Sequence, residues 1–196
     1  MSAEDTLTRR QLFIQRFAEG QANAAEKTLV RIYAKAQARI LRDPDAITAS
    51  RLSSLTDDIT KLLGAEFIDL KADVRQGVLD FAEDQAEFTT KALQAESTVI
   101  LNTVSLEVLE QTVFSRGLDT PLGPNTITLD EAFDTFAINK RRDLLTTIND
   151  GILLGQSTSD IAKQVSEVAE LRPRSQVKTL VRTTINHTAA MAEKAV

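Results

Sequence analysis

Two long runs of apolar residues at three- and four-residue spacing constrain this chain more than any other feature. The first run lies within residues 3–41 and contains Phe13, Phe17, Ala24, Ala25, Leu29, Ile32, Ala36 and Ile40. The second contains Leu52, Leu55, Ile59, Leu62, Phe67, Leu70, Val74, Val78, Phe81, Phe88 and Ala92. Apolar residues at this spacing form one stripe along an α-helix. Because one stripe buries only one face, we expect two long helices that pair as a hairpin.

Turn-forming residues set the ends of these two helices. Asp43-Pro44-Asp45 should end the first helix at Leu41, because the residue before a proline avoids helical angles. Thr48 or Ser50 would cap the start of the second helix. Gly64 leaves open whether the second run is one helix of roughly 45 residues or two shorter ones.

The densest turn chemistry lies at residues 116–128, which hold two prolines and two glycines. We expect this loop to separate a long helical hairpin at residues 1–115 from a C-terminal helical module at residues 129–196. Shorter helices are expected at 105–114, at 130–154 with Gly155 as C-cap, from a capping Ser157 or Ser159 to 168, and from 174 onward. The predicted fold class is all-α, with an elongated long-helix hairpin followed by a smaller C-terminal helical module.

The net charge of −5 argues against general nucleic-acid binding, because affinity for the phosphate backbone depends on a high density of Lys and Arg. Acidic residues follow one face of the second helix: Asp57, Asp58, Glu66, Asp69, Asp73, Asp80, Glu83, Asp84 and Glu87. We interpret this face as solvated, the alternative being a surface that repels DNA or meets a basic partner. The basic clusters are Lys140, Arg141, Arg142, Arg172, Arg174 and Lys178. They could contact DNA phosphates or an acidic helix of a neighbouring subunit.

The sequence lacks the residue combinations on which common catalytic and metal sites depend. The sequence has one histidine, His187, and no cysteine, so most of the usual zinc ligands and most members of a nucleophilic triad are missing. No glycine-rich phosphate loop and no nucleophile elbow occur. We therefore expect no enzymatic activity, no metal and no cofactor. No apolar run approaches the roughly 18 residues of a membrane span, and the N-terminus does not read as a signal peptide.

The C-terminal third contains a more specific pattern. Gly151, Gly155 and Ser157 form a Gly-x-x-x-Gly-x-Ser step, and Ile161-Ala162 begins the helix that follows. A basic linker leads to Val181-Arg182-Thr183, with Asn186 downstream and the run Ala189-Ala190-Met191-Ala192 near the end.

This order and spacing resemble the phage head morphogenesis family, the Mu-type minor head proteins found beside the portal. The resemblance covers about residues 130–196, a third of the chain. Thr184 stands where the family usually has Glu, and the sequence ends at Val196, where family members often continue into a strand-containing tail.

The resemblance implies a non-enzymatic virion protein, present in several copies inside the head near the portal and in the host cytoplasm during assembly. Its partners would be the portal protein, the capsid protein or further copies of itself, with weak contact to packaged DNA and no membrane. It would act in head morphogenesis, genome packaging or DNA ejection. The motif residues would be structural, and we expect Arg182 to hold the last helix against the turn at Gly151 and Gly155 through buried hydrogen bonds to helix-end carbonyls.

Two other functions remain open from the sequence. A helical scaffold or adaptor could work by helix pairing alone. Residues 155–162 also read like the opening of a helix-turn-helix DNA-binding unit, although no base-reading set of side chains follows them.

Overall fold

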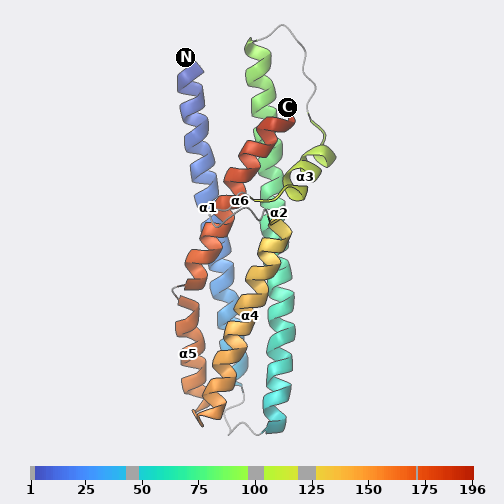
Figure 1. Ribbon diagram of the computed structural model, residues 1–196. Coiled ribbons are helices and arrows are strands. Elements are labelled where there is room, and N and C mark those ends of the chain that lie inside the picture. The colour runs from blue at the N-terminus through green and yellow to red at the C-terminus, as the bar shows by residue number, and fades with distance from the viewer. Residues whose placement is uncertain (1–2, 43–48, 97–103, 119–126, 171) are drawn as a thin grey trace. The chain divides into compact units, whose positions relative to one another are not determined.

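The computed structural model describes residues 3–42, 49–96, 104–118, 127–170 and 172–196. These residues form six helices and no β-strand. The helices are α1 (Ala3–Leu41), α2 (Ala49–Glu96), α3 (Leu106–Ser115), α4 (Leu129–Leu153), α5 (Thr158–Glu170) and α6 (Arg172–Ala195) (Figure 1). Helices account for 92% of the described residues, so the predicted all-α class is confirmed. None of these helices is long and apolar enough to cross a membrane.

The predicted helix ends agree closely with the structure. Helix α1 has the expected bounds, and α2 runs through Gly64 without a break. Ser50 lies inside α2 rather than capping it, and Thr48 is outside the described residues. Ser105 caps α3. Helix α6 begins at Arg172, two residues before the predicted start, because Pro173 fits the first turn of a helix, where its missing N–H costs nothing.

The chain divides into two compact units that do not follow the boundary predicted at residues 116–128. Unit 1 contains residues 1–23, 73–132 and 179–196, and unit 2 contains residues 24–72 and 133–178. Each unit therefore combines segments from before and after the predicted loop. Residues 119–126 of that loop lie outside the described residues, and its flanks pair through one isolated antiparallel bridge between Leu118 and Ile127.

Antiparallel pairing of α1 and α2 recurs in each unit. In unit 1 the rings of Phe17 and Phe81 stack with centroids 4.9 Å apart, and Arg10 meets Gln85 further along. In unit 2 Arg39 pairs with Asp58 at 2.6 Å. Lower-numbered residues of α1 meet higher-numbered residues of α2 throughout, which is the pattern of a helical hairpin. The predicted long-helix hairpin is therefore present.

The buried stripe of α1 differs from the predicted one at its N-terminal end. Leu29, Ile32, Ala36 and Ile40 are fully buried as expected, but Phe13 is 42% exposed. Ile14, Ala18 and Ala22 take the core positions of the first turns, and Ala24 is exposed while Ala25 is buried. Small alanines permit close helix approach, while Phe13 lies at the edge against the Arg10 guanidinium, 4.7 Å from its ring centre.

A polar chain joins three helices of unit 1. Gln85 of α2 is 1% exposed, accepts a hydrogen bond from Arg10 Nε at 2.7 Å and donates one to Glu193 at 2.9 Å. Arg10 also pairs with Asp84 at 2.6 Å and lies over the ring of Phe88. Gln85 thus satisfies both ends of its amide by linking α1 to α6, as a buried amide requires.

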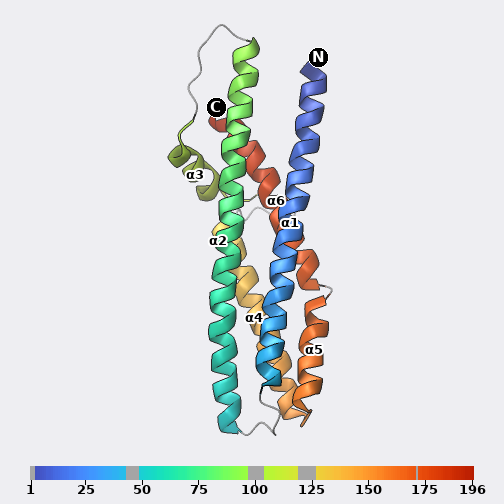
Figure 2. The same cartoon turned by 180° about the vertical axis from the view of Figure 1, so that it is seen from behind.

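Arg75 organises the other side of unit 1. Its guanidinium donates to Asp130 and to Glu110, each at 2.8 Å, and lies 3.8 Å from the ring centre of Phe114. These contacts tie α2 to α3 and to the first turn of α4. The Thr128 backbone N–H and hydroxyl bond to Glu131 and hold its pKa below the usual value, which completes a capping box at the start of α4. Both views show α3 beside α2 and the end of α6, where Ala86, Leu109 and Ala192 pack together (Figures 1 and 2).

Unit 2 is built from the later part of α1, the earlier part of α2, most of α4, all of α5 and the first residues of α6. Phe67 of α2 and Phe136 of α4 meet edge to face with ring centres 6.1 Å apart. In both views α5 lies beside the later part of α1 (Figures 1 and 2). The core of this unit includes Leu29, Ile59, Leu144, Ile148 and Ile161.

Tyr33 is buried in the core of unit 2, with 3% of its surface exposed. Among the described residues its hydroxyl has no hydrogen-bond partner. Burial raises the pKa of the phenol, and the nearby negative charge of Asp143 raises it further. Neutral Tyr33 is therefore strongly favoured in the folded state.

We predict that replacing Gln85 by Ala destabilises the protein by about 2–3 kcal/mol, because Arg10 and Glu193 lose a buried partner and a cavity remains. Gln76→Ala is the matched control. The side chain of Gln76 is exposed on the same helix and, within the described part of the chain, bonds only to Asp80, so its loss should cost less than about 0.5 kcal/mol. Urea unfolding of both variants measures the difference, and equal midpoints would contradict the role of the Gln85 chain.

We further predict an alkaline loss of stability that depends on Tyr33. Its folded pKa is raised above the ordinary value of 10.0, so its contribution to stability is complete below pH 10 and is lost as the pH rises above that value. Tyr33→Phe should be neutral or stabilising at pH 7, because the phenol has no partner to lose, and should flatten this alkaline decline. Since Tyr33 is the only tyrosine and the chain has no tryptophan, phenolate absorbance reports on it alone. Ionisation of the native protein near pH 10 would refute the assignment.

Candidate functional site: a glycine corner and an open groove

Helix α4 ends in a hydrogen-bonded corner built by the two motif glycines. Gly155 has a φ of +67°, in the left-handed region that favours glycine. Its N–H donates to the Ile152 carbonyl at 3.0 Å, and the Gln156 N–H donates to the Gly151 carbonyl at 2.9 Å. This is the Schellman arrangement, in which two crossed hydrogen bonds satisfy the last carbonyls of a helix. The predicted C-cap at Gly155 is confirmed.

Gly151 serves the same corner by close packing. A Cβ atom at this position would lie 2.6 Å from Ile161 Cγ1 and 2.9 Å from Gln156 Oε1. Ile161 is fully buried at the start of α5. The absence of a side chain at residue 151 therefore lets α5 pack against the end of α4.

Ser157 begins the next helix. Its Oγ accepts a hydrogen bond from the Asp160 N–H at 3.1 Å and donates one to Asp160 Oδ2 at 2.6 Å. Ser157, rather than Ser159, is therefore the N-cap of α5. Ile161, Ala162 and Val165 of α5 are buried, as the amphipathic pattern requires.

The expected role of Arg182 is wrong. Its guanidinium pairs with Glu19 of α1, with Nε 2.9 Å from Oε2, and the two side chains are 44% and 45% exposed. Arg182 is thus part of a half-exposed ion pair in unit 1 rather than of a buried set of hydrogen bonds. The carbonyls that it was expected to satisfy already accept hydrogen bonds from Gly155 and Gln156 of their own corner.

The rest of the α6 motif separates into a buried row and an exposed face. One row of side chains along α6 is buried: Val177, Val181, Thr184, Thr188 and Met191. The Thr184 hydroxyl donates to the Leu180 carbonyl at 2.8 Å, so this position is satisfied within the helix. Thr183 is half-buried, and Asn186 is exposed one turn after Arg182.

The basic residues of unit 2 do not form one cationic surface. Lys140 is only 8% exposed and pairs with Asp143 at 3.0 Å, and Lys178 lies 3.4 Å from Glu26. Arg174 is partly buried, and its Nε has no partner among the described residues. Arg142 is exposed, Arg141 is half-buried beside the groove described next, and the side chain of Arg172 lies outside the described residues.

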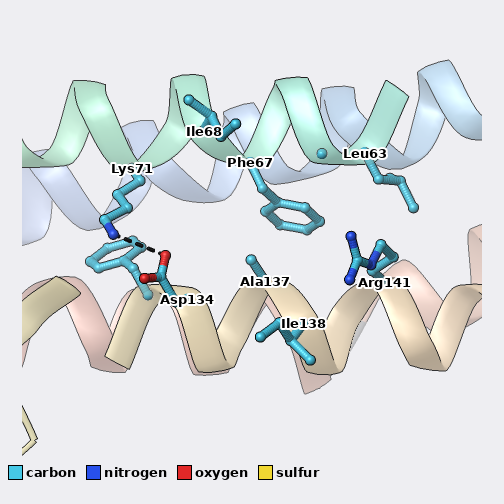
Figure 3. A pocket seen from close by; sticks show the side chains of 10 residues that line it. Leu63, Phe67, Ile68, Lys71, Asp134, Ala137, Ile138 and Arg141 are labelled. Carbon is cyan, nitrogen blue, oxygen red and sulfur yellow. Dashed lines mark hydrogen bonds and ion pairs between the residues drawn. The ribbon is translucent and has the colours of Figure 1, made fainter. Parts of the chain in front are cut away.

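An open groove lies between α2 and α4 in unit 2, with a volume of about 360 Å³. Its lining consists of Leu63, Gly64, Phe67, Ile68, Lys71, Phe133, Asp134, Ala137, Ile138 and Arg141. Figure 3 shows Phe67 reaching toward α4 from α2, with Lys71 and Asp134 joined across one end at 2.9 Å. Ile68 and Ile138 are 69% and 47% exposed. The groove is mainly apolar, and Arg141 is its one cation without a carboxylate partner among the described residues.

Gly64 and Ala137 help to leave this groove open. A Cβ atom at Gly64 would have no heavy atom within 4 Å. From the sequence, Gly64 indicated only a possible break in α2, and its effect on the groove was not predicted. A glycine inside an uninterrupted apolar stripe was the signal that could have indicated a gap in packing.

We predict that Gly151→Ala destabilises the protein by about 1–3 kcal/mol, because the new methyl group overpacks the contact with Ile161. Gly20→Ala is the control: it also lies in a helix, but its Cβ meets nothing within 4 Å. That variant should gain about 0.4–1 kcal/mol from a less flexible unfolded chain. Denaturant unfolding of the pair gives the sign of each change, and a stabilised Gly151→Ala would exclude the close contact.

The chain finds no match in the comparisons with protein-family models, with curated proteins or with solved structures.

Proposed function

We propose that this protein is a non-enzymatic structural protein of a phage head, placed near the portal and acting in head morphogenesis, genome packaging or DNA ejection. The observation that carries the proposal is the corner at residues 151–157. Gly151 permits close packing, Gly155 adopts the left-handed conformation and Ser157 caps α5. A simple turn would need only Gly155. The separate structural roles of Gly151 and Ser157 therefore support the match to the Gly-x-x-x-Gly-x-Ser spacing of the minor head proteins.

Helix α6 would supply part of the surface for a partner. Its apolar row is buried within the protein, while Arg182 and Asn186 lie one turn apart on an exposed face. In this proposal that face contacts the portal protein, the capsid protein or another copy of this chain. Arg182 would then bind a partner's carboxylate or carbonyl in addition to Glu19.

Contact with packaged DNA is a minor part of the proposal. Lys140 and Lys178 already have carboxylate partners, and the net charge of the chain is −5. Of the six predicted basic residues, only Arg141, Arg142 and Arg174 remain among those whose side chains the structure describes. Such a small set supports only weak binding with a shallow salt dependence, because the salt slope grows with the number of phosphate contacts. A helix-turn-helix function receives correspondingly little support.

A helical adaptor that works by helix pairing is the second candidate, and the apolar groove between α2 and α4 favours it. The two functions differ in where the protein is found. A head protein is retained in purified particles, whereas an adaptor leaves with the assembly intermediates or with a cellular complex.

Mass spectrometry of purified particles tests the proposal, and we expect several copies per head that remain with the portal after DNA release. Arg182→Ala should retain its fold, since an exposed ion pair contributes about 0.2–1 kcal/mol, but should be incorporated less efficiently. Lys91→Ala is the matched control, because it removes an exposed ion pair with Glu87 on α2. The proposal would be overturned if particles purified from cells that express the wild-type protein do not contain it.

A further inference from the structure

Two leucines at the corner of unit 2 are among the most exposed apolar side chains described. Leu153 is 83% exposed and Leu154 is 75% exposed. Asp150 lies one turn before them and is also exposed, with no ion pair or hydrogen bond of its side chain among the described residues. The corner therefore projects two large apolar side chains beside one uncompensated carboxylate.

The groove between α2 and α4 has the complementary composition. Its lining is mostly apolar and its volume of about 360 Å³ has room for two leucine side chains. Lys71 and Asp134 neutralise each other at one end. The remaining cation of the lining, Arg141, has no carboxylate partner among the described residues, and its charge is opposite to that of Asp150 at the corner.

The corner of one molecule cannot enter its own groove. Arg141 and Leu153 belong to the same helix, α4, and lie about 18 Å apart along its axis at 1.5 Å of rise per residue. A helix holds this separation fixed. Any contact between the corner and the groove must therefore be made between two copies of the chain.

We propose that the α2–α4 groove of one copy binds the Leu153-Leu154 corner of a second copy, with Asp150 of the second copy paired to Arg141 of the first. Each molecule then carries both the groove and the corner, so two copies can exchange the contact in a two-fold dimer or many copies can repeat it head-to-tail. Such contacts close into rings when the rotation between subunits permits, and otherwise extend into filaments. The inference uses only contacts within unit 2 and stands independently of the proposed function.

Gly64→Leu is the variant that blocks the groove. The added side chain enters open space rather than a packed core, and leucine is a better helix former than glycine. Gly20→Leu is the matched control, since Gly20 is exposed on α1 and also has open space around it. Both variants should melt at or above the wild-type temperature, which separates a blocked surface from a damaged fold.

The corner is removed by the double variant Leu153→Ser, Leu154→Ser. Both leucines are exposed, so the fold should tolerate the change. We expect wild type and Gly20→Leu to associate with rising concentration in sedimentation velocity, whereas Gly64→Leu and the corner variant remain monomers. Arg141→Glu should weaken association at least tenfold, and Asp150→Arg combined with Arg141→Glu should restore part of it.

Mixing the two monomeric variants is the decisive measurement. The Gly64→Leu copy keeps an intact corner and the corner variant keeps an intact groove, so the mixture should form one heterodimer and nothing larger. A corner variant that still self-associates would show that association does not use the corner and would overturn the proposal. Wild-type protein that stays monomeric at high concentration, or a mixture that forms no heterodimer, would overturn it as well.

Discussion

Burial of the two long apolar stripes is the constraint on which the rest of this structure depends. Helices α1 and α2 each have a stripe, and pairing them covers only part of it because a helix shields one side of its neighbour. Each compact unit therefore places further helices against the hairpin. In unit 1 these are α3 and the later part of α6, and in unit 2 they are α4 and α5. The shorter helices exist as helices because the hairpin offers them an apolar surface.

Three of the nine acidic residues on this face of α2 pair with basic residues of α1. Asp84 and Asp58 pair with Arg10 and Arg39 of α1, and Lys35 of α1 pairs with Glu66. Exposed pairs of this kind add little to stability individually. Their positions along both helices disfavour other registers, because in a shifted hairpin these charges would no longer face opposite charges. The acidic face is therefore engaged in the hairpin in part, while other members such as Asp57, Asp69 and Asp73 are exposed, as predicted for a solvated face.

The sequence predicted local structure well and predicted tertiary contacts poorly, for a physical reason. Helix ends depend on nearby residues, so a helix start near Ser105, the C-cap Gly155 and a capping serine at 157 or 159 could be predicted from the sequence alone. The role of Arg182 depended on which carboxylate lies within reach, and Glu19 is 163 positions away. The two-unit division likewise depends on how segments distant in sequence pack. No loop composition at 116–128 could indicate that both units draw on both halves of the chain.

The corner at the end of α4 shows how one local solution creates an exposed surface. A Schellman motif is often closed by an apolar contact between the third residue from the helix end and the second residue beyond the cap. Here those positions are Gly151 and Gln156, which offer no such contact. Instead, the side chain of Ile161 occupies the space that a Cβ atom at Gly151 would need, so α5 packs close to α4 and this buried contact stabilises the corner. Leu153 and Leu154 are then left on the outer side of the turn without cover. Both leucines lie on a backbone that the Schellman hydrogen bonds hold in one conformation, so a partner that binds them has little backbone entropy to remove on association.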